Sequence, residues 1–297
     1  MARVKYRDWA PTTDAQERVL LINRILTEYP GMRVTVRQIY YRLVARRHIE
    51  NNPREYDRVQ DLLTKARYAG LIDWTAIEDR VREPTRMADW PSLKARLDEA
   101  TNFRLDRWRS QHHYVELWVE KDALASVLEP VASDFHVTLM VNRGYSSASA
   151  MRDAALRLTR ACQPTPHAPH GRRAIVLYIG DHDPSGLDMV RDVRERLFEF
   201  GVPPATDVRP IALTRAQIEE HEAPPNPTKV TDSRAAEYIA EFGHESWEVD
   251  ALPPTALDLV ARQHIKAYID RDAMTAVITE EKQLLAKLQK FIKTFTE

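Results

Sequence analysis

Apolar residues divide the chain into two regions that differ in periodicity. Up to about residue 70, apolar residues recur every three or four positions, which predicts amphipathic helices. Further on, four short apolar runs alternate with helical patterns, at 114–119, 137–141, 175–179 and 208–213. Such runs are typical of strands buried on both faces of a parallel sheet. The pattern therefore predicts a multi-domain α/β protein, with a helical first domain and a parallel α/β second domain.

The first domain contains a helix predicted over residues 36–49. Thr35 followed three residues later by Gln38 forms a capping-box pattern at its start. Its apolar stripe includes Tyr40, whereas Tyr41 is turned about 100° away and is predicted to face the polar side, near Arg37. A tyrosine hydroxyl beside guanidinium groups is a candidate nucleophile toward a phosphodiester. The alternative is an exposed tyrosine stacked among arginines, with no catalytic role.

A second helix, predicted at about residues 55–69, follows the break at Asn51-Asn52-Pro53. Two helices joined by a short turn and followed by an extended segment resemble a winged helix-turn-helix domain of the CAP-like kind. Its candidate phosphate contacts are Arg42, Arg46, Arg54, Arg58, Lys65 and Arg67. A solvated helix face is the alternative, because neighbouring acidic residues dilute this charge.

Charge is distributed unevenly along the 297 residues, although the net charge is only −1. Residues 1–110 carry 22 Lys and Arg against 16 Asp and Glu, and residues 111–297 carry 21 against 28. The resulting charges of +6 and −7 suggest a polyanion bound by the first part and a metal ion by the second, unless the asymmetry is chance. Residues 84–112 are predicted to form a connecting helical segment, and we therefore predict a domain boundary near residue 110.

Several function classes are disfavoured by composition. A single cysteine, Cys162, excludes an internal disulfide and fits a reducing cytoplasm. No apolar run reaches the length of a membrane span, and the first residues lack the apolar core of a signal peptide. The expectation is a cytoplasmic protein without a membrane partner. No GxxxxGK[ST] loop is present, so we expect no nucleotide site in this chain.

Candidate metal ligands follow two of the predicted strands. Glu120 comes directly after strand 114–119, and Asp181 and Asp183 follow strand 175–179. Because parallel strands end at one edge of a sheet, the three carboxylates are expected to converge there. Ligands that are all oxygen favour Mg²⁺, with Mn²⁺ as a substitute. The alternative for the aspartates is a solvated turn with an Asp helix cap.

A Glu at one strand end followed by Asp-x-Asp at a later one is the Toprim pattern. With VEKDAL and GDHDPSGL, it resembles the Toprim domain, a Rossmann-like fold, in the DNA-cleaving subunit of topoisomerase VI and its meiotic double-strand-break relatives. Further motifs that resemble this family appear in family order: TVRQIYYRL, RGYSSASAMR, PTKVTDSR and WEVDAL. The resemblance covers about residues 33–265. It departs from the family at Ser146, which replaces a proline, and at His182, between the aspartates.

The resemblance implies specific roles. Tyr41 would attack double-stranded DNA and become joined to the 5′ end, Arg37 would steady the phosphate, and Glu120 would act both in catalysis and as a metal ligand. Asp181 and Asp183 would complete the Mg²⁺ site. Arg143 and Lys229, in two of the similar motifs, would contact DNA. The resemblance also implies a homodimer in which the tyrosine and the metal ligands of one site come from different subunits. It further implies a possible separate ATPase or regulatory subunit, and a nucleoid-associated or mobile-element-encoded protein.

Three functions remain open at this point. The first is a Mg²⁺-dependent transesterase with Tyr41 as nucleophile. The second is a hydrolytic Toprim nuclease of the defence type, in which the metal activates water and Tyr41 is a bystander. The third is a DNA-binding module that needs a partner for any chemistry.

Overall fold

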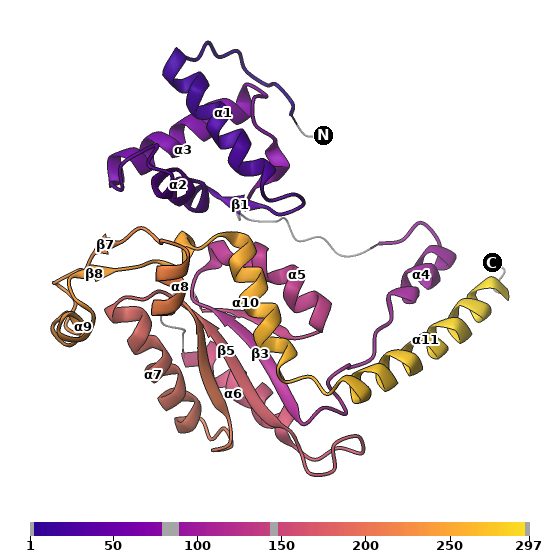
Figure 1. Ribbon diagram of the computed structural model, residues 1–297. Helices are drawn as coiled ribbons and strands as arrows, with labels where there is room; N and C mark the ends of the chain where they lie inside the picture. Colours follow the sequence, from indigo (N-terminus) through magenta and orange to yellow (C-terminus); the bar gives the residue numbers. More distant parts are fainter. Residues whose placement is uncertain (1–2, 79–88, 143–147, 295–297) are drawn as a thin grey trace.

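The computed structural model describes residues 3–78, 89–142 and 148–294 (Figure 1). Its first domain, residues 3–78, contains helices α1 (Thr13–Thr27), α2 (Val36–Ala45) and α3 (Pro53–Tyr68). The Thr35 side chain and that of Gln38 form the predicted capping box at the start of α2. Asn52 caps α3 and Pro53 occupies its first turn, where a missing N–H costs nothing.

A four-stranded parallel sheet forms the centre of the second domain. It consists of β3 (His113–Val119), β4 (Thr138–Val141), β5 (Arg173–Ile179) and β6 (Asp207–Ala212), in the order β4-β3-β5-β6. All four strands agree with the predicted runs to within two residues at each end. The parallel α/β class of this domain is therefore confirmed, and it is compatible with a Rossmann-like fold.

Helices cover both faces of this sheet (Figure 1). One face packs against α5 (Ala125–Phe135) and α10 (Pro254–Lys266), and the other against α6 (Ala148–Cys162) and α7 (Pro184–Glu199). Alternate strand residues supply the two cores. Leu117 and Val119 face α5 and α10, and Trp118 faces α6 and α7. The apolar core on the α5 side continues into the first domain without a break.

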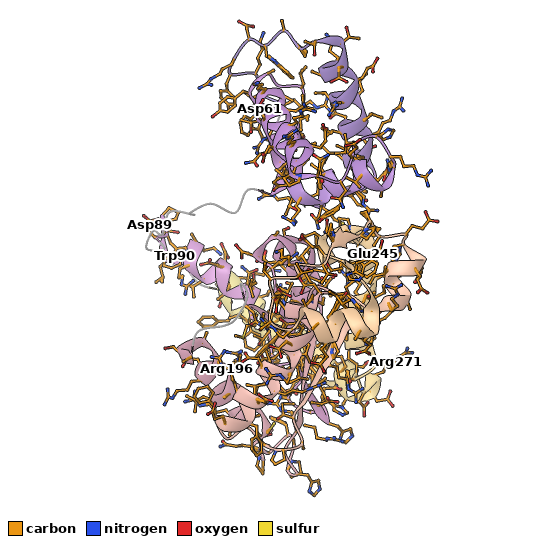
Figure 2. The ribbon with its side chains drawn as sticks, turned by 90° about the vertical axis from the view of Figure 1, so that its left-hand side faces the viewer. Asp61, Asp89, Trp90, Arg196, Glu245 and Arg271 are labelled. Atoms are coloured by element: carbon orange, nitrogen blue, oxygen red, sulfur yellow. The ribbon has the colours of Figure 1, made fainter. Side chains whose placement is uncertain are left out.

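The remaining segments lie at two ends of the second domain. At the end near the first domain lie α8 (Arg215–Glu220), α9 (Ala235–Phe242) and the antiparallel pair β7 (Asn226–Pro227) and β8 (Glu245–Ser246). Glu245 is labelled there in Figure 2, whereas Asp61 lies on the first domain. Helices α4 (Leu93–Glu99) and α11 (Arg271–Thr294) contact each other and project from the side of the second domain that is on the right in Figure 1.

Two predicted helical segments are shorter in the structure. The helix expected over 36–49 ends at Ala45, because Arg46 leaves helical geometry and Arg47 adopts a positive φ of 58°. Of the connecting segment expected over 84–112, the described residues contain only α4 and one 3₁₀ turn, Ala100–Asn102.

The segment that follows α4 packs on the second domain. Trp108 is buried and donates its indole N–H to the carbonyl oxygen of Phe135, and Leu105 N–H donates to the carboxylate of Glu281. These contacts place the change of domain before this segment, earlier than the boundary predicted near residue 110.

Of the predicted winged-helix domain, the described residues show the helices but not the antiparallel wing. Strands β1 (Val34–Thr35) and β2 (Ile77–Glu78) pair in parallel, and the described part of the first domain has no antiparallel hairpin. Residues 79–88 lie outside the described residues. None of the helices in the described residues combines the length and the apolar character that a membrane span requires.

Candidate active site between the two domains

Glu120 and Asp181 meet at the carboxyl edge of the sheet, directly after β3 and β5. The backbone N–H of Asp181 donates to Oε2 of Glu120 over 3.1 Å. Gly180 makes this approach possible, since a Cβ there would lie 2.8 Å from the same oxygen. Glu120 and Asp181 therefore come together at this edge of the sheet, as predicted. We call Glu120, Asp181 and Asp183 the carboxylate edge.

Asp183 has a structural task as well. Its Oδ1 accepts a 2.6 Å hydrogen bond from the N–H of Gly186 and caps helix α7. This is the helix-cap alternative foreseen from the sequence. The same charge still acts on the carboxylate edge, because it adds to the burial that raises the pKa of Glu120. Asp183 thus combines a cap with a place in the acidic cluster.

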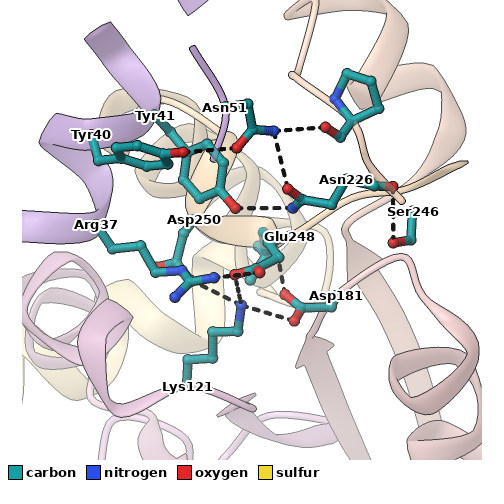
Figure 3. A network of polar contacts seen from close by, with 12 residues as sticks. Arg37, Tyr40, Tyr41, Asn51, Lys121, Asp181, Asn226, Ser246, Glu248 and Asp250 are labelled. Carbon is teal, nitrogen blue, oxygen red and sulfur yellow. Dashed lines mark hydrogen bonds and ion pairs between the residues drawn. The ribbon is translucent and has the colours of Figure 1, made fainter. Parts of the chain in front are cut away.

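Lys121 lies at the centre of a polar network that joins the carboxylate edge to the loop after β8 (Figure 3). Its ammonium group is 2.8 Å from Asp181, 2.8 Å from Glu248 and 3.0 Å from Asp250. Burial alone would lower the pKa of Lys121, but the three carboxylates outweigh it and raise the pKa well above its ordinary value. Lys121 is therefore an internal cation that neutralises part of the cluster.

The protonation of the carboxylates reflects their crowding. Burial raises the pKa of Asp181 to about 7, and the charge of Glu120 adds to the effect while Lys121 opposes it. Glu248 behaves in the opposite way: despite its burial, Lys121 and Arg37 hold its pKa below the ordinary value. The cluster therefore carries one carboxyl group that exchanges its proton near neutral pH.

Tyr41 lies beside this network, at the contact between the two domains. Its hydroxyl accepts a 3.0 Å hydrogen bond from the side-chain amide of Asn226, and its ring centroid is 5.8 Å from Cζ of Arg37. Arg37 in turn donates to Glu248 and lies 3.6 Å from Asp250. A chain of contacts thus runs from Tyr41 through Arg37 and Glu248 to Lys121 and the carboxylate edge.

Tyr41 lies beside Arg37 on the polar side of α2, but the expectation that this side leaves it exposed is wrong. Only 2% of Tyr41 is exposed, and burial raises its pKa. The physical reason is that the polar side of α2 docks on the second domain. Arg42 donates to the carbonyl oxygen of Ala251, and Asn51 donates to Asn226 (3.0 Å) and to the carbonyl oxygen of Pro225 (2.7 Å).

The candidate DNA contacts fall into different environments. Arg54, Arg58 and Lys65 are exposed along α3, and Lys229 is exposed after β7. Arg46 is exposed and pairs with Glu28. Arg42 is engaged in the domain contact, and Arg67 is buried with its guanidinium 5.2 Å from the ring of Trp74, so neither lies on the exposed basic surface. Arg143 lies outside the described residues.

His182, between the two aspartates, points away from the acidic cluster. It is buried with its ring against Tyr238, Phe242 and Trp247, and its backbone pairs with Trp247. Burial lowers its pKa. This residue therefore ties the Asp-x-Asp turn to the segment that carries Glu248.

The side chains at the edge fit a hard divalent cation by their chemistry. No three His, Cys, Asp or Glu side chains among the described residues stand in a ready metal-binding arrangement. The donors are nevertheless all carboxylate oxygens, and Oδ1 of the fully buried Asp250 accepts no hydrogen bond within the described part of the chain. A divalent cation would offset the mutual repulsion of these groups, as the ammonium of Lys121 does in part.

Sequence reasoning did not assign four residues of this site. Lys121, Glu248 and Asp250 lie in the motifs VEKDAL and WEVDAL, where the alternation of acidic and apolar residues is a signal for a buried acidic segment. Asn226 lies in a proline-rich stretch that carries no such signal. Comparisons of the chain with protein-family models, curated proteins and solved structures found no match.

Proposed function

We propose that this protein is a Mg²⁺-dependent enzyme that binds and cleaves double-stranded DNA, with Tyr41 as the nucleophile. The observation that carries the proposal is the continuous network from Tyr41 through Arg37 to the carboxylate edge. It brings a phenol, a guanidinium group and an oxygen-rich acidic cluster together, and these are the groups that phosphodiester transesterification requires.

The proposed step joins Tyr41 to DNA. Its hydroxyl oxygen gives up its proton and bonds to the phosphorus, the bond from phosphorus to the 3′ oxygen breaks, and that oxygen takes up a proton. The product is a 5′-phosphotyrosyl link and a free 3′ hydroxyl. Arg37 would leave Glu248 and donate to the phosphate, where its fork of N–H groups matches two oxygens.

Glu120, Asp181 and Asp183 would hold Mg²⁺, or Mn²⁺ in its place. When bound, the ion supplies neutralisation of the phosphate charge and stabilisation of the leaving oxygen. The neighbouring Lys121 would keep Glu248 and Asp250 paired, so that these two carboxylates do not repel the DNA backbone.

The finer assignments belong to the same proposal. The first domain would act as a winged-helix module that grips DNA through Arg54, Arg58 and Lys65, whose contacts would be salt-sensitive and independent of sequence. A homodimer would place two such sites on opposite strands, and a separate subunit would supply any ATP-driven step. A cytoplasmic location fits this substrate.

One observation favours a second function, hydrolysis by a Toprim nuclease. Tyr41 is buried and its pKa is raised, so in this arrangement it is a neutral phenol that DNA does not reach. In that case water would attack the phosphate at the carboxylate edge, and the products would carry free ends.

Covalent trapping separates these functions. Supercoiled plasmid, protein and Mg²⁺ are mixed and denatured, and 5′ ends are probed for attached protein. We expect attachment in the wild type, none with Tyr41→Phe, and none with EDTA. Tyr40→Phe, which removes the neighbouring hydroxyl, is the matched control and should still form the link. If Tyr41→Phe still cuts DNA and the products carry free ends, the reaction is hydrolysis. If the wild type binds DNA in a salt-dependent way but does not cut it, the protein is a DNA-binding module.

A further inference from the structure

Asn142 is a buried amide whose side chain makes no hydrogen bond to any described residue. It lies one residue beyond β4 and is only 5% exposed. Within the described part of the chain, neither Oδ1 nor Nδ2 has a partner. A buried amide without partners costs folding free energy, because it has lost its hydrogen bonds to water. Such a group points to a ligand.

The strand register places Asn142 beside Glu120. Val141 pairs with Val119 in the β3–β4 ladder, and the N–H of Asn142 donates to the carbonyl oxygen of Val119 over 2.8 Å. The next pair along the two strands is therefore Glu120 and Asn142. Residues that pair in a parallel ladder project to the same face of the sheet.

Contacts of earlier residues in β3 and β4 show which face of the sheet Glu120 and Asn142 share. Arg157 of α6 contacts both Glu116 (2.9 Å) and the sulfur of Met140 (3.7 Å), so even-numbered residues of β3 and β4 share the α6 side. Asn142 and Glu120 continue these two rows. The unpartnered amide thus adjoins the carboxylate edge, on the row that ends in Glu120.

We propose that Asn142 is a fourth residue of the divalent-cation site, where its amide oxygen serves the ion that Glu120 binds, directly or through a water molecule of that ion. This inference rests on the metal site of the proposed function and goes beyond it by adding a neutral ligand to three carboxylates. An amide oxygen is a hard donor that suits Mg²⁺ and Mn²⁺. Being uncharged, it adds coordination without further repulsion among the acidic groups.

Mn²⁺ binding without DNA tests the assignment. Free Mn²⁺ is measured by electron paramagnetic resonance during titration of the protein at pH 8. We expect Asn142→Leu to weaken the affinity about tenfold or more. Asn142→Asp, which keeps an oxygen at the same place, should bind at least as tightly as the wild type. Asp181→Asn should abolish binding, which locates the ion at the carboxylate edge.

Thermal unfolding supplies the second measurement. Without metal, Asn142→Leu should melt at or above the wild-type temperature, because it removes an unpaired polar group. The matched control is Thr228→Val, which removes a buried hydroxyl that likewise has no partner among the described residues and should leave Mn²⁺ affinity unchanged. If Asn142→Leu does not fold, Asn142→Ala takes its place with the same expected loss.

Several results would overturn the inference. They are unchanged Mn²⁺ affinity in Asn142→Leu, equal weakening in the Leu and Asp variants, and Mn²⁺ binding that survives Asp181→Asn. The first result would leave a buried water as the partner of the amide. Since the titration uses no DNA, failure to cleave DNA would sink the proposed function and leave this inference standing.

Discussion

Asp181 shows how one side chain takes its properties from its neighbours. It is 8% exposed, its Oδ1 accepts the N–H of Val249 over 2.8 Å, and its Oδ2 faces Lys121. These partners favour the charged form, yet burial prevails and raises the pKa to about 7. A carboxyl group with a raised pKa stabilises the folded protein at low pH and withdraws that stabilisation as the pH rises.

This raised pKa predicts a pH-dependent difference between the metal-free wild type and Asp181→Asn. Between about pH 4 and pH 7 the carboxyl group of Asp181 ionises in the unfolded protein but stays protonated in the folded protein, so its contribution to wild-type stability falls. This contribution should level off above pH 7, where the group is ionised in both states. Asparagine does not ionise, so the melting temperature of Asp181→Asn minus that of the wild type should increase from about pH 4.5 to 7 and then stay constant. A difference that is flat over this range would contradict the assignment.

Gly186 controls the backbone of the Asp-x-Asp turn. A Cβ at this position would lie 2.2 Å from the carbonyl oxygen of Asp181, a distance that requires backbone movement. We expect Gly186→Ala to destabilise the protein by about 1–3 kcal/mol, as overpacked substitutions do, and to displace Asp181 from the edge. Urea unfolding measures the loss. Ser185 lies next to Gly186 in the same turn, and Ser185→Ala removes its side-chain hydrogen bond to Asp232. This substitution should lower the free energy of unfolding by less than Gly186→Ala does.

At the scale of the element, helix α7 links folding to the proposed chemistry through its N-cap residue. Asp183 caps the helix, and its charge belongs to the acidic cluster. These two tasks are separable, because asparagine caps a helix about as well as aspartate but brings no charge.

The prediction for this element compares two substitutions. Asp183→Ala should lower the free energy of unfolding by about 1 kcal/mol through loss of the cap. Asp183→Asn should keep nearly all of that stability. Both should weaken Mn²⁺ binding about tenfold. Urea unfolding and Mn²⁺ titration on the same samples measure the two effects. Wild-type Mn²⁺ affinity in Asp183→Asn would show that Asp183 is a cap alone.

Helix α2 shows what local sequence can and cannot predict. The capping box of Thr35 and Gln38 and the burial of Tyr40 follow from local spacing, and both are present. The burial of Tyr41 does not follow, since a helical pattern separates apolar from polar faces but does not say what covers the polar one. Here the cover is the segment around Ala251, which lies 209 residues beyond Arg42 in the sequence.

The same distinction applies to the carboxylate edge. Unbroken apolar runs predicted the parallel strands, and parallel strands bring Glu120 to Asp181 whatever the loops do. The network of Lys121 with Glu248 and Asp250 depends on how a long connection after β6 folds back, and no periodicity encodes that path. Regular elements were therefore predictable, and contacts made by irregular segments were not.

At the scale of the whole molecule, the proposed nucleophile lies inside the domain contact. Tyr41 is bonded to Asn226, and Asn51 next to it is bonded to the same residue. Both Tyr41 and the carboxylate edge belong to one chain, whereas the resemblance implies that they meet between subunits. If Tyr41 is the nucleophile, as proposed, DNA must reach its buried hydroxyl, and the two domains must then separate before cleavage.

A reversible lock across this contact tests the need for separation. The Nδ2 atom of Asn51 and the Oδ1 atom of Asn226 are 3.0 Å apart. Asn51→Cys with Asn226→Cys, in a Cys162→Ser background, therefore brings two thiols within reach of a short bismaleimide whose linker contains a disulfide. We expect the cross-linked protein to lose at least nine-tenths of its DNA cleavage and to regain it when the linker is reduced, because the bridge holds Tyr41 away from the phosphate. Each single-cysteine variant is the control, and the cross-linker should not change its cleavage. Equal cleavage by the locked and reduced forms would mean that DNA is cleaved without domain separation. Attack by water at the carboxylate edge would then be the explanation.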